Sequence, residues 1–127
     1  MVSVASHLIT VEREQGEIVS GRCRLADRPW TRLRGLLGRR RLNPNEGLLL
    51  RPVGAIHTLF MLFAIDVVFL DRDYVVVKVV ENLRPWRFAA ARRAKAVLEL
   101  PPGGARRLRV GEQLVIVPNW HTERKAA

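Results

Sequence analysis

The chain has 127 residues, of which 48% are hydrophobic and 27% are charged, a composition typical of a folded globular protein. This length suits a single domain and excludes two separate hydrophobic cores. The net charge is +10, which points to anionic partners, and the single cysteine excludes an internal disulfide.

The sequence contains no segment that we expect to enter a membrane. The longest apolar run, residues 59–65, ends at Asp66 and is much shorter than the roughly 18 residues of a membrane span. Residues 1–16 lack a charged region followed by a long apolar region, so they do not resemble a secretory signal. We therefore expect a cytoplasmic protein. Cys23 lies in strand-like sequence, where a buried, inert thiol is favoured over a nucleophile.

Short strand-like segments make up most of the chain. They are rich in β-branched and aromatic residues and are separated by turn sequences such as EREQG, NPNEG and PPGG. The strongest strand signal is YVVVKVVE. The predicted strands are residues 8–11, 17–25, 48–50, 55–61, 65–70, 74–81, 95–100 and 114–117.

One segment has helical rather than strand-like spacing. Asp27 can cap a helix at its N-terminus and Pro29 suits the first helical turn. Apolar residues then recur at helical spacing until Gly38 provides a stop. The pattern predicts one short helix near residues 28–37.

These elements predict a mainly β fold, with the helix as a minor α component. Seven to eight short strands and one short helix indicate a compact antiparallel β barrel or sandwich. The domain is expected to span residues 7–117, and residues 118–127 a frayed C-terminal tail. Residues 82–93, which contain Pro85 and Trp86, are expected to form a long loop or a ragged short helix.

Polar residues interrupt the otherwise apolar stretch AIHTLFMLFAIDVVFLD at His57, Thr58 and Asp66. A buried polar group without a partner costs about 1 to 3 kcal/mol, so each must be satisfied by a ligand or by the protein's own backbone. If residues 55–61 pair with residues 65–70, the register decides whether His57 and Asp66 share a face. The sequence leaves both the register and the partner open.

Three blocks of sequence resemble a known family. They are RGLLGRRRLNPNEGLLL, IHTLFMLFAIDVVFLDRDYVVVKVV and AVLELPPGGARRLRVGEQLVI. In this order and spacing they resemble the bacterial and archaeal family called domain of unknown function 192, over roughly residues 15–117. The family pattern falls here on His57-Thr58 with Met61, on Ile65-Asp66 and on Leu98-Glu99-Leu100. The resemblance implies a mostly β fold carrying a short helix, and it implies no established activity.

The function favoured by these residues is a non-catalytic binding or accessory module. A polar cavity at the mouth of the barrel would hold a small ligand or a peptide. No cofactor is expected, and no metal, because the domain body has too few histidines and cysteines at the usual spacing. The candidate ligand-binding residues are His57, Thr58, Met61, Asp66 and Glu99.

A hydrolase-like enzyme is an alternative function. It would use His57 as the general base and Asp66 to orient it, and the two side chains would need hydrogen-bond reach of about 2.6 to 3.2 Å. No nucleophile is predicted on a sharp turn, since Ser20, Cys23 and Thr58 all lie in strand-like sequence. The sequence therefore gives an enzyme less support than a binding module.

Weak, non-specific binding of nucleic acid or another polyanion is a second alternative. The basic residues are nearly all arginines, as a GC-rich genome would encode on any surface. Trp30, Trp86 and Phe88 lie beside arginines and could stack on nucleic-acid bases, although Trp30 fits the apolar face of the predicted helix better. The candidate polyanion-binding residues are Arg39, Arg40, Arg41, Arg92 and Arg93.

Overall fold

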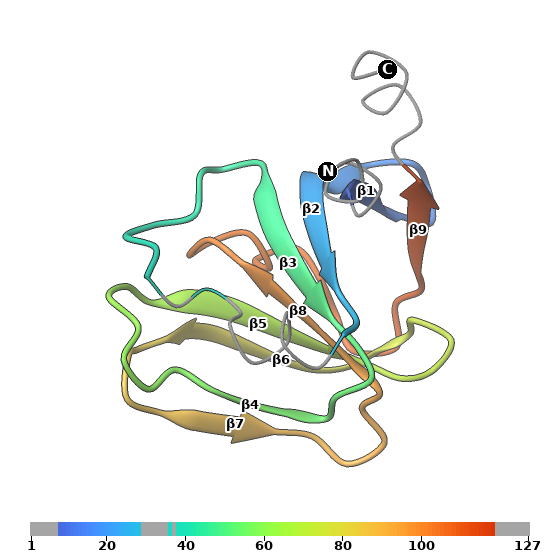
Figure 1. The fold of residues 1–127 in the computed structure, drawn as a ribbon. Helices are drawn as coiled ribbons and strands as arrows, with labels where there is room; N and C mark the ends of the chain where they lie inside the picture. The colour runs from blue at the N-terminus through green and yellow to red at the C-terminus, as the bar shows by residue number, and fades with distance from the viewer. Residues whose placement is uncertain (1–7, 29–35, 37, 119–127) are drawn as a thin grey trace.

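The computed structural model describes residues 8–28, 36 and 38–118, and these residues form nine strands and no helix (Figure 1). The strands are β1 (Leu8–Arg13), β2 (Ile18–Ala26), β3 (Glu46–Leu50), β4 (Ala55–His57), β5 (Ile65–Leu70), β6 (Val76–Leu83), β7 (Phe88–Ala90), β8 (Ala96–Leu100) and β9 (Leu114–Pro118).

Seven of the strands form one mixed sheet in the order β6-β5-β8-β3-β2-β1-β9. Its strand pairs are antiparallel, as predicted, except that β2 and β3 are parallel, with Cys23 opposite Gly47. A parallel pair needs a connection long enough to return the chain to the same end of the sheet, and residues 27–45 make that connection. The prediction of a wholly antiparallel sheet was wrong at this pair.

The large sheet curls until its two edge strands approach each other. Val75, just before β6, pairs with Gln113, just before β9. Next to this bridge, the Val76 amide donates to the Glu112 carbonyl at 2.9 Å, and the Leu114 amide donates to the Tyr74 carbonyl at 3.0 Å. The architecture is therefore a curled half-barrel, not a sandwich of two similar sheets.

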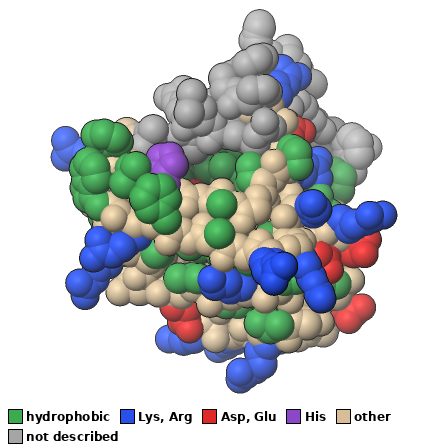
Figure 2. Space-filling model, turned by 90° about the horizontal axis from the view of Figure 1, so that it is seen from below, with side chains coloured by type: hydrophobic (Ala, Val, Ile, Leu, Met, Phe, Trp, Pro, Cys, Tyr) green, Lys and Arg blue, Asp and Glu red, His purple; other side chains and the backbone are tan. Residues whose placement is uncertain are grey.

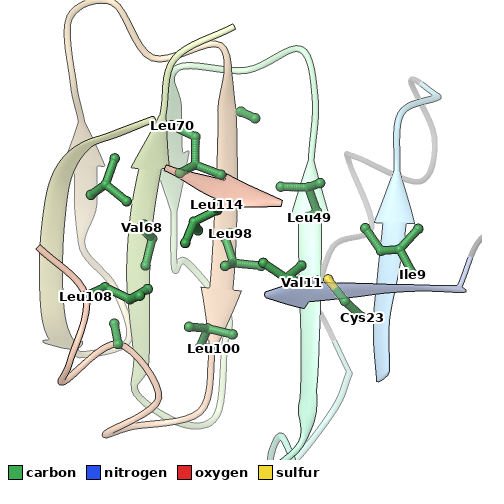
Figure 3. Packing of buried hydrophobic residues seen from close by; sticks show 13 residues of the cluster. Ile9, Val11, Cys23, Leu49, Val68, Leu70, Leu98, Leu100, Leu108 and Leu114 are labelled. Atoms are coloured by element: carbon green, nitrogen blue, oxygen red, sulfur yellow. The ribbon is translucent and has the colours of Figure 1, made fainter. Parts of the chain in front are cut away.

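The hydrophobic core of the domain is divided by the curled sheet into two clusters, one on each face. Side chains alternate along a strand, so Val68 of β5 packs into one cluster, inside the curl (Figure 3), while Val67 and Phe69 pack into the other. Strands β5 and β8 are buried along their whole length for this reason. Their continuous apolar sequence reflects burial on both faces.

A small sheet made of β4 and β7 lies against the second face (Figure 1). Ile56 of β4 and Ala89 of β7 pack onto the second cluster. The predicted strand over residues 55–61 ends at His57, which is opposite Phe88 in β7. The pairing of residues 55–61 with residues 65–70, which the sequence left open, is not formed, because β4 pairs with β7. Strand β7 lies inside the segment predicted as a loop or short helix.

Two predicted features fall outside the described residues. The predicted helix over residues 28–37 is one of them, since only Arg28 and Leu36 of that segment are described. The predicted C-terminal tail is the other, apart from Pro118, which ends β9. Within the described ranges, no helix is long and apolar enough to cross a membrane.

Candidate functional site

Asp66 is a buried acceptor for backbone amides. One carboxylate oxygen accepts from the Asn82 amide at 2.9 Å, and the other accepts from the amides of Gly103 and Ala105, both at 3.0 Å. Its exposed fraction is 1%. Asp66 thus joins β5 to the end of β6 and to the PPGG turn after β8. Of the two partners that the sequence left open, a ligand or the protein's own backbone, the structure shows the backbone.

Thr58 is also buried and holds two loops together. Its hydroxyl donates to the Arg84 carbonyl at 2.6 Å and accepts from the Arg87 amide at 2.9 Å. Its backbone amide donates to the Arg87 carbonyl at 2.8 Å, and its carbonyl accepts from the Trp86 amide at 2.9 Å. These four bonds fix the loop after β4 against the loop before β7.

His57 lies on the exposed surface of β4. Its Nδ1 atom accepts from the Leu59 amide at 3.2 Å, and its ring centroid is 6.3 Å from that of Phe88. Asp66 belongs to the other sheet and bonds only to backbone amides among the described residues. The structure therefore does not assemble the His57–Asp66 pair that a hydrolase would use.

Glu99 and Met61 lie toward the second hydrophobic cluster. Glu99 is opposite Leu48 in β3 and Val67 in β5, and its exposed fraction is 4%. Burial raises the pKa of this carboxyl to about 8, so it is largely protonated at neutral pH.

The predicted cavity at the barrel mouth is therefore not formed by its five predicted residues. The side chains of Asp66 and Thr58 form hydrogen bonds with backbone groups, and His57 is exposed. Glu99 and Met61 are enclosed in an apolar layer. Cys23 is fully buried, and burial raises the pKa of its thiol to about 12. This agrees with the inert thiol that the sequence favoured.

The predicted polyanion-binding arginines lie in two separate places. The segment of residues 39–41 precedes β3, at the upper left of Figure 1, while the segment of residues 92–93 follows β7, at the lower right. Arg39 also forms an ion pair with Glu46 at 2.7 Å. The structure does not bring these five residues into one patch.

The structure does bring together an exposed surface that we call the aromatic ridge, formed by Phe60, Leu62, Trp86 and Phe88. The exposed fractions of these side chains are 67%, 64%, 55% and 74%. The Phe60 and Trp86 ring centroids are 4.7 Å apart, with the ring planes at 58°. Figure 2 shows hydrophobic side chains gathered around a histidine, with cationic side chains nearby. Large apolar groups gathered on a surface mark an interaction site.

The backbone beneath the aromatic ridge is strained. Phe60 and Trp86 both have φ of 65°, in the left-handed region that bulky residues rarely occupy. The four hydrogen bonds of Thr58 hold this arrangement in place. Strain of this kind persists only where the surrounding structure imposes it, and it collects at functional sites.

Two arginines flank the aromatic ridge. Arg84 and Arg87 are exposed, and the Arg87 guanidinium donates to the Trp86 carbonyl at 3.3 Å. Neither forms an ion pair with another described residue. The surface thus combines exposed aromatic rings with uncompensated positive charge, an arrangement that attracts anionic groups next to flat, apolar ones.

The fold is a curled seven-stranded half-barrel with a small covering sheet. The chain belongs to the domain of unknown function 192 family, described as "Uncharacterized ACR", whose model matches residues 10–116. The resemblance predicted from the sequence is confirmed.

Three archaeal relatives called UPF0127 proteins are similar in sequence. The Thermococcus sibiricus protein is 36% identical over 102 residues, which cover 73% of this chain and 63% of that protein. The Pyrococcus abyssi protein is 48% identical over 56 residues, 43% of this chain and 47% of that protein. The Pyrococcus horikoshii protein is 46% identical over 50 residues, 39% and 43% of the two chains. The matches thus span less than two thirds of each relative.

Two crystal structures have a similar fold. A Novosphingobium aromaticivorans protein of unknown function gives a TM-score of 0.72 at 24% identity, covering 85% of this chain and 83% of that one. A Sinorhizobium meliloti protein, provisionally described as a transcription regulator, gives 0.73 at 25% identity, covering 85% and 91%. The similarity to the Novosphingobium aromaticivorans protein, at 24% identity, shows a shared fold and nothing about function.

Proposed function

We propose that this chain is a non-catalytic binding module that holds single-stranded nucleic acid on the aromatic ridge. The observation that carries the proposal is the cluster of exposed rings beside Arg84 and Arg87. Proteins that bind single strands combine stacking rings with cationic groups that follow the phosphates. This site replaces the polar cavity that the sequence predicted.

Exposed aromatic rings supply the first part of the interaction. Phe88 is 74% exposed and Trp86 is 55% exposed, so a base can reach either ring without unfolding the loops. Stacking of one base on an aromatic side chain contributes about 1 to 3 kcal/mol. A duplex already covers the faces of its bases by stacking them on each other, so the ridge favours single strands.

Positive charge supplies the second part. The chain carries a net charge of +10. Glu17, Glu46 and Glu112 pair with arginines away from the ridge, so they do not offset Arg84 and Arg87. A second copy of this cationic chain would be repelled, whereas a phosphate backbone would be attracted.

Substitution of Trp86 tests the stacking directly. Wild type, Trp86→Leu and Trp86→Tyr are titrated against a fluorescent oligothymidylate of about 15 nucleotides, with affinity followed by polarisation. We expect Trp86→Leu to bind about tenfold more weakly, because leucine keeps an apolar surface but has no ring. Trp86→Tyr should stay close to wild type. Val110→Ala serves as the control, because Val110 is 66% exposed outside the ridge.

Three results would contradict the proposal. One is equal affinity of wild type and Trp86→Leu for the single strand. Another is equal or tighter binding of a duplex of the same length, which would indicate attraction to phosphates alone. The third is no binding of either nucleic acid, the result expected if the ridge docks a protein instead.

A further inference from the structure

We propose a second binding site, independent of the aromatic ridge, for a small organic anion that carries a carboxylate or a phosphate group. It is a hollow of about 300 Å³ at the edge of the sheet where β2, β3 and β5 end, which we call the rim hollow. The side chains that matter for its chemistry are Asp27, Arg51, Asp71, Arg72, Tyr74 and Lys95.

The strand directions explain why these residues meet. Strand β2 is parallel to β3, and both β3 and β5 are antiparallel to β8, so β2, β3 and β5 run the same way. Their last residues therefore lie at one edge, next to the start of β8. Asp27, Arg51 and Asp71 each follow the last residue of one of these strands, and Lys95 precedes β8.

The sheet fixes the cationic positions through the backbone. The Arg51 amide donates to the Ala26 carbonyl at 3.1 Å, at the end of β2. The Lys95 amide donates to the Leu70 carbonyl at 2.8 Å, at the end of β5. The backbones of Arg51 and Lys95 are thus held by the sheet at the ends of neighbouring strands, as a preorganised site requires.

Tyr74 holds the Arg51 side chain in place. The Arg51 guanidinium donates to the Tyr74 hydroxyl. Tyr74 has φ of 64°, and its backbone bonds to Asp71 and Leu114 at 3.0 Å keep it in this left-handed conformation. Residues held in this sparsely populated backbone region cluster at functional sites.

The charges in the rim hollow favour an anion. It carries three cationic side chains and two carboxylates, which leaves one net positive charge: Arg51, Arg72 and Lys95 against Asp27 and Asp71. Asp71 is partly engaged already, because its Oδ1 atom accepts from the Asp73 amide at 2.8 Å and the Val75 amide at 3.0 Å. An anionic group of one charge therefore neutralises the net charge of these side chains.

The shape and lining suggest what the anion is attached to. Pro52, Ala96 and the Tyr74 ring give the hollow apolar walls. A guanidinium binds planar oxyanions through parallel hydrogen bonds, and a hollow of this size holds a small molecule. The ligand class is therefore a carboxylate or phosphate group on a small apolar or aromatic body.

Two probes with the same ring distinguish the two headgroups. Benzoate and phenyl phosphate are titrated into the full chain up to about 10 mM, with benzyl alcohol as the uncharged match, and binding is followed by calorimetry and by the NMR signals of Tyr74. We expect at least one charged probe to bind saturably and the alcohol not to bind. Tighter binding of one probe identifies the headgroup.

Variants locate the binding. Arg72→Gln removes an exposed side chain of the hollow, and Arg106→Gln removes an exposed arginine elsewhere with the same change in net charge. We expect Arg72→Gln to weaken binding about tenfold, equivalent to about 1.4 kcal/mol, and Arg106→Gln to leave it unchanged. Tyr74→Phe should also weaken binding, because it removes the hydroxyl that accepts a hydrogen bond from the Arg51 guanidinium.

The proposal is overturned if neither charged probe binds saturably, or if Arg72→Gln and Arg106→Gln weaken binding equally, which would indicate diffuse attraction to net charge. Unfolding midpoints of each variant show whether Tyr74→Phe acts through folding. If Tyr74→Phe destabilises the fold, the comparison of Arg72→Gln with Arg106→Gln decides whether the rim hollow binds the probe. Failure here would leave the nucleic-acid proposal untouched, because the probes do not contain a base.

Discussion

Glu99 places a carboxyl group in the middle of an apolar layer, between the large sheet and its covering sheet. Its neighbours across the strands are Leu48 and Val67, and no cation lies among the causes that set its pKa. Burial alone raises that pKa from 4.5 to about 8. The protonated form is therefore the one that the folded protein accommodates.

This environment predicts that Glu99 makes stability depend on pH. Between pH 4.5 and about 8, the folded carboxyl stays protonated while the unfolded one ionises, so the unfolded state binds fewer protons. The free energy of unfolding contributed by Glu99 is therefore greatest below pH 4.5 and falls as pH rises, by up to about 1.4 kcal/mol per pH unit.

Glu99→Gln should remove this dependence because glutamine stays neutral. In urea denaturation, we expect the variant and wild type to be nearly equal at about pH 5 and the variant to be more stable by a few kcal/mol at about pH 8. All other titrating groups are shared, so the difference between the two proteins isolates Glu99. Parallel pH profiles would show that the carboxyl is already ionised in the folded state.

At the scale of elements, the strands with the plainest sequence signals were predicted, and the three-residue strand β7 was not. Strands β5 and β8 are continuous apolar runs because both of their faces are buried. Strand β7 has only three residues, in a segment where Pro85 and Trp86 suggested a loop. The partner of β4 was missed for the same reason, since local pattern does not encode which distant segment completes a pair.

The candidate site was only partly predictable for the same reason, because local sequence does not determine which distant segments meet. Buried polar residues were expected at His57, Thr58 and Asp66, and two of the three are indeed buried and satisfied by backbone. His57 and Asp66 are separated because β4 pairs with β7 in the second sheet, and the sequence left that pairing open. Trp86 and Phe88 were noted as possible base-stacking residues, but only the structure places Phe60 beside Trp86.

Thr58 connects the two loops that carry the aromatic ridge, so its hydroxyl should matter for binding as well as stability. Thr58→Val has nearly the same shape but leaves the Arg87 amide and the Arg84 carbonyl without their side-chain partner. We expect a loss of about 1 to 3 kcal/mol in unfolding free energy, measured by urea denaturation.

Oligothymidylate affinity should also fall in Thr58→Val under conditions where the variant is fully folded. Thr58→Ser keeps the hydroxyl and is the matched control. If valine and serine variants bind equally well, the loops do not need this connection to present the ridge.

For the molecule as a whole, the distribution of charge matters more than its total. Several carboxylates lie in ion pairs on the side of β1 and the turn before β9, where Arg13 contacts Glu17 and Glu112. The aromatic ridge lies on the loops of the covering sheet, beside Arg84 and Arg87. Long-range attraction brings a polyanion to any part of this cationic surface, whereas the ridge carries the exposed phenylalanine and tryptophan rings of the described residues.

Mapping the contact by NMR tests the central claim most directly. Isotope-labelled protein is titrated with oligothymidylate of about 15 nucleotides at about 0.15 M salt, where the screening length is about 8 Å. The account predicts that the largest amide shift changes fall on residues 57–62 and 84–88, and that they saturate together. Largest changes at residues 39–41 or 106–109, with the ridge amides unmoved, would contradict it.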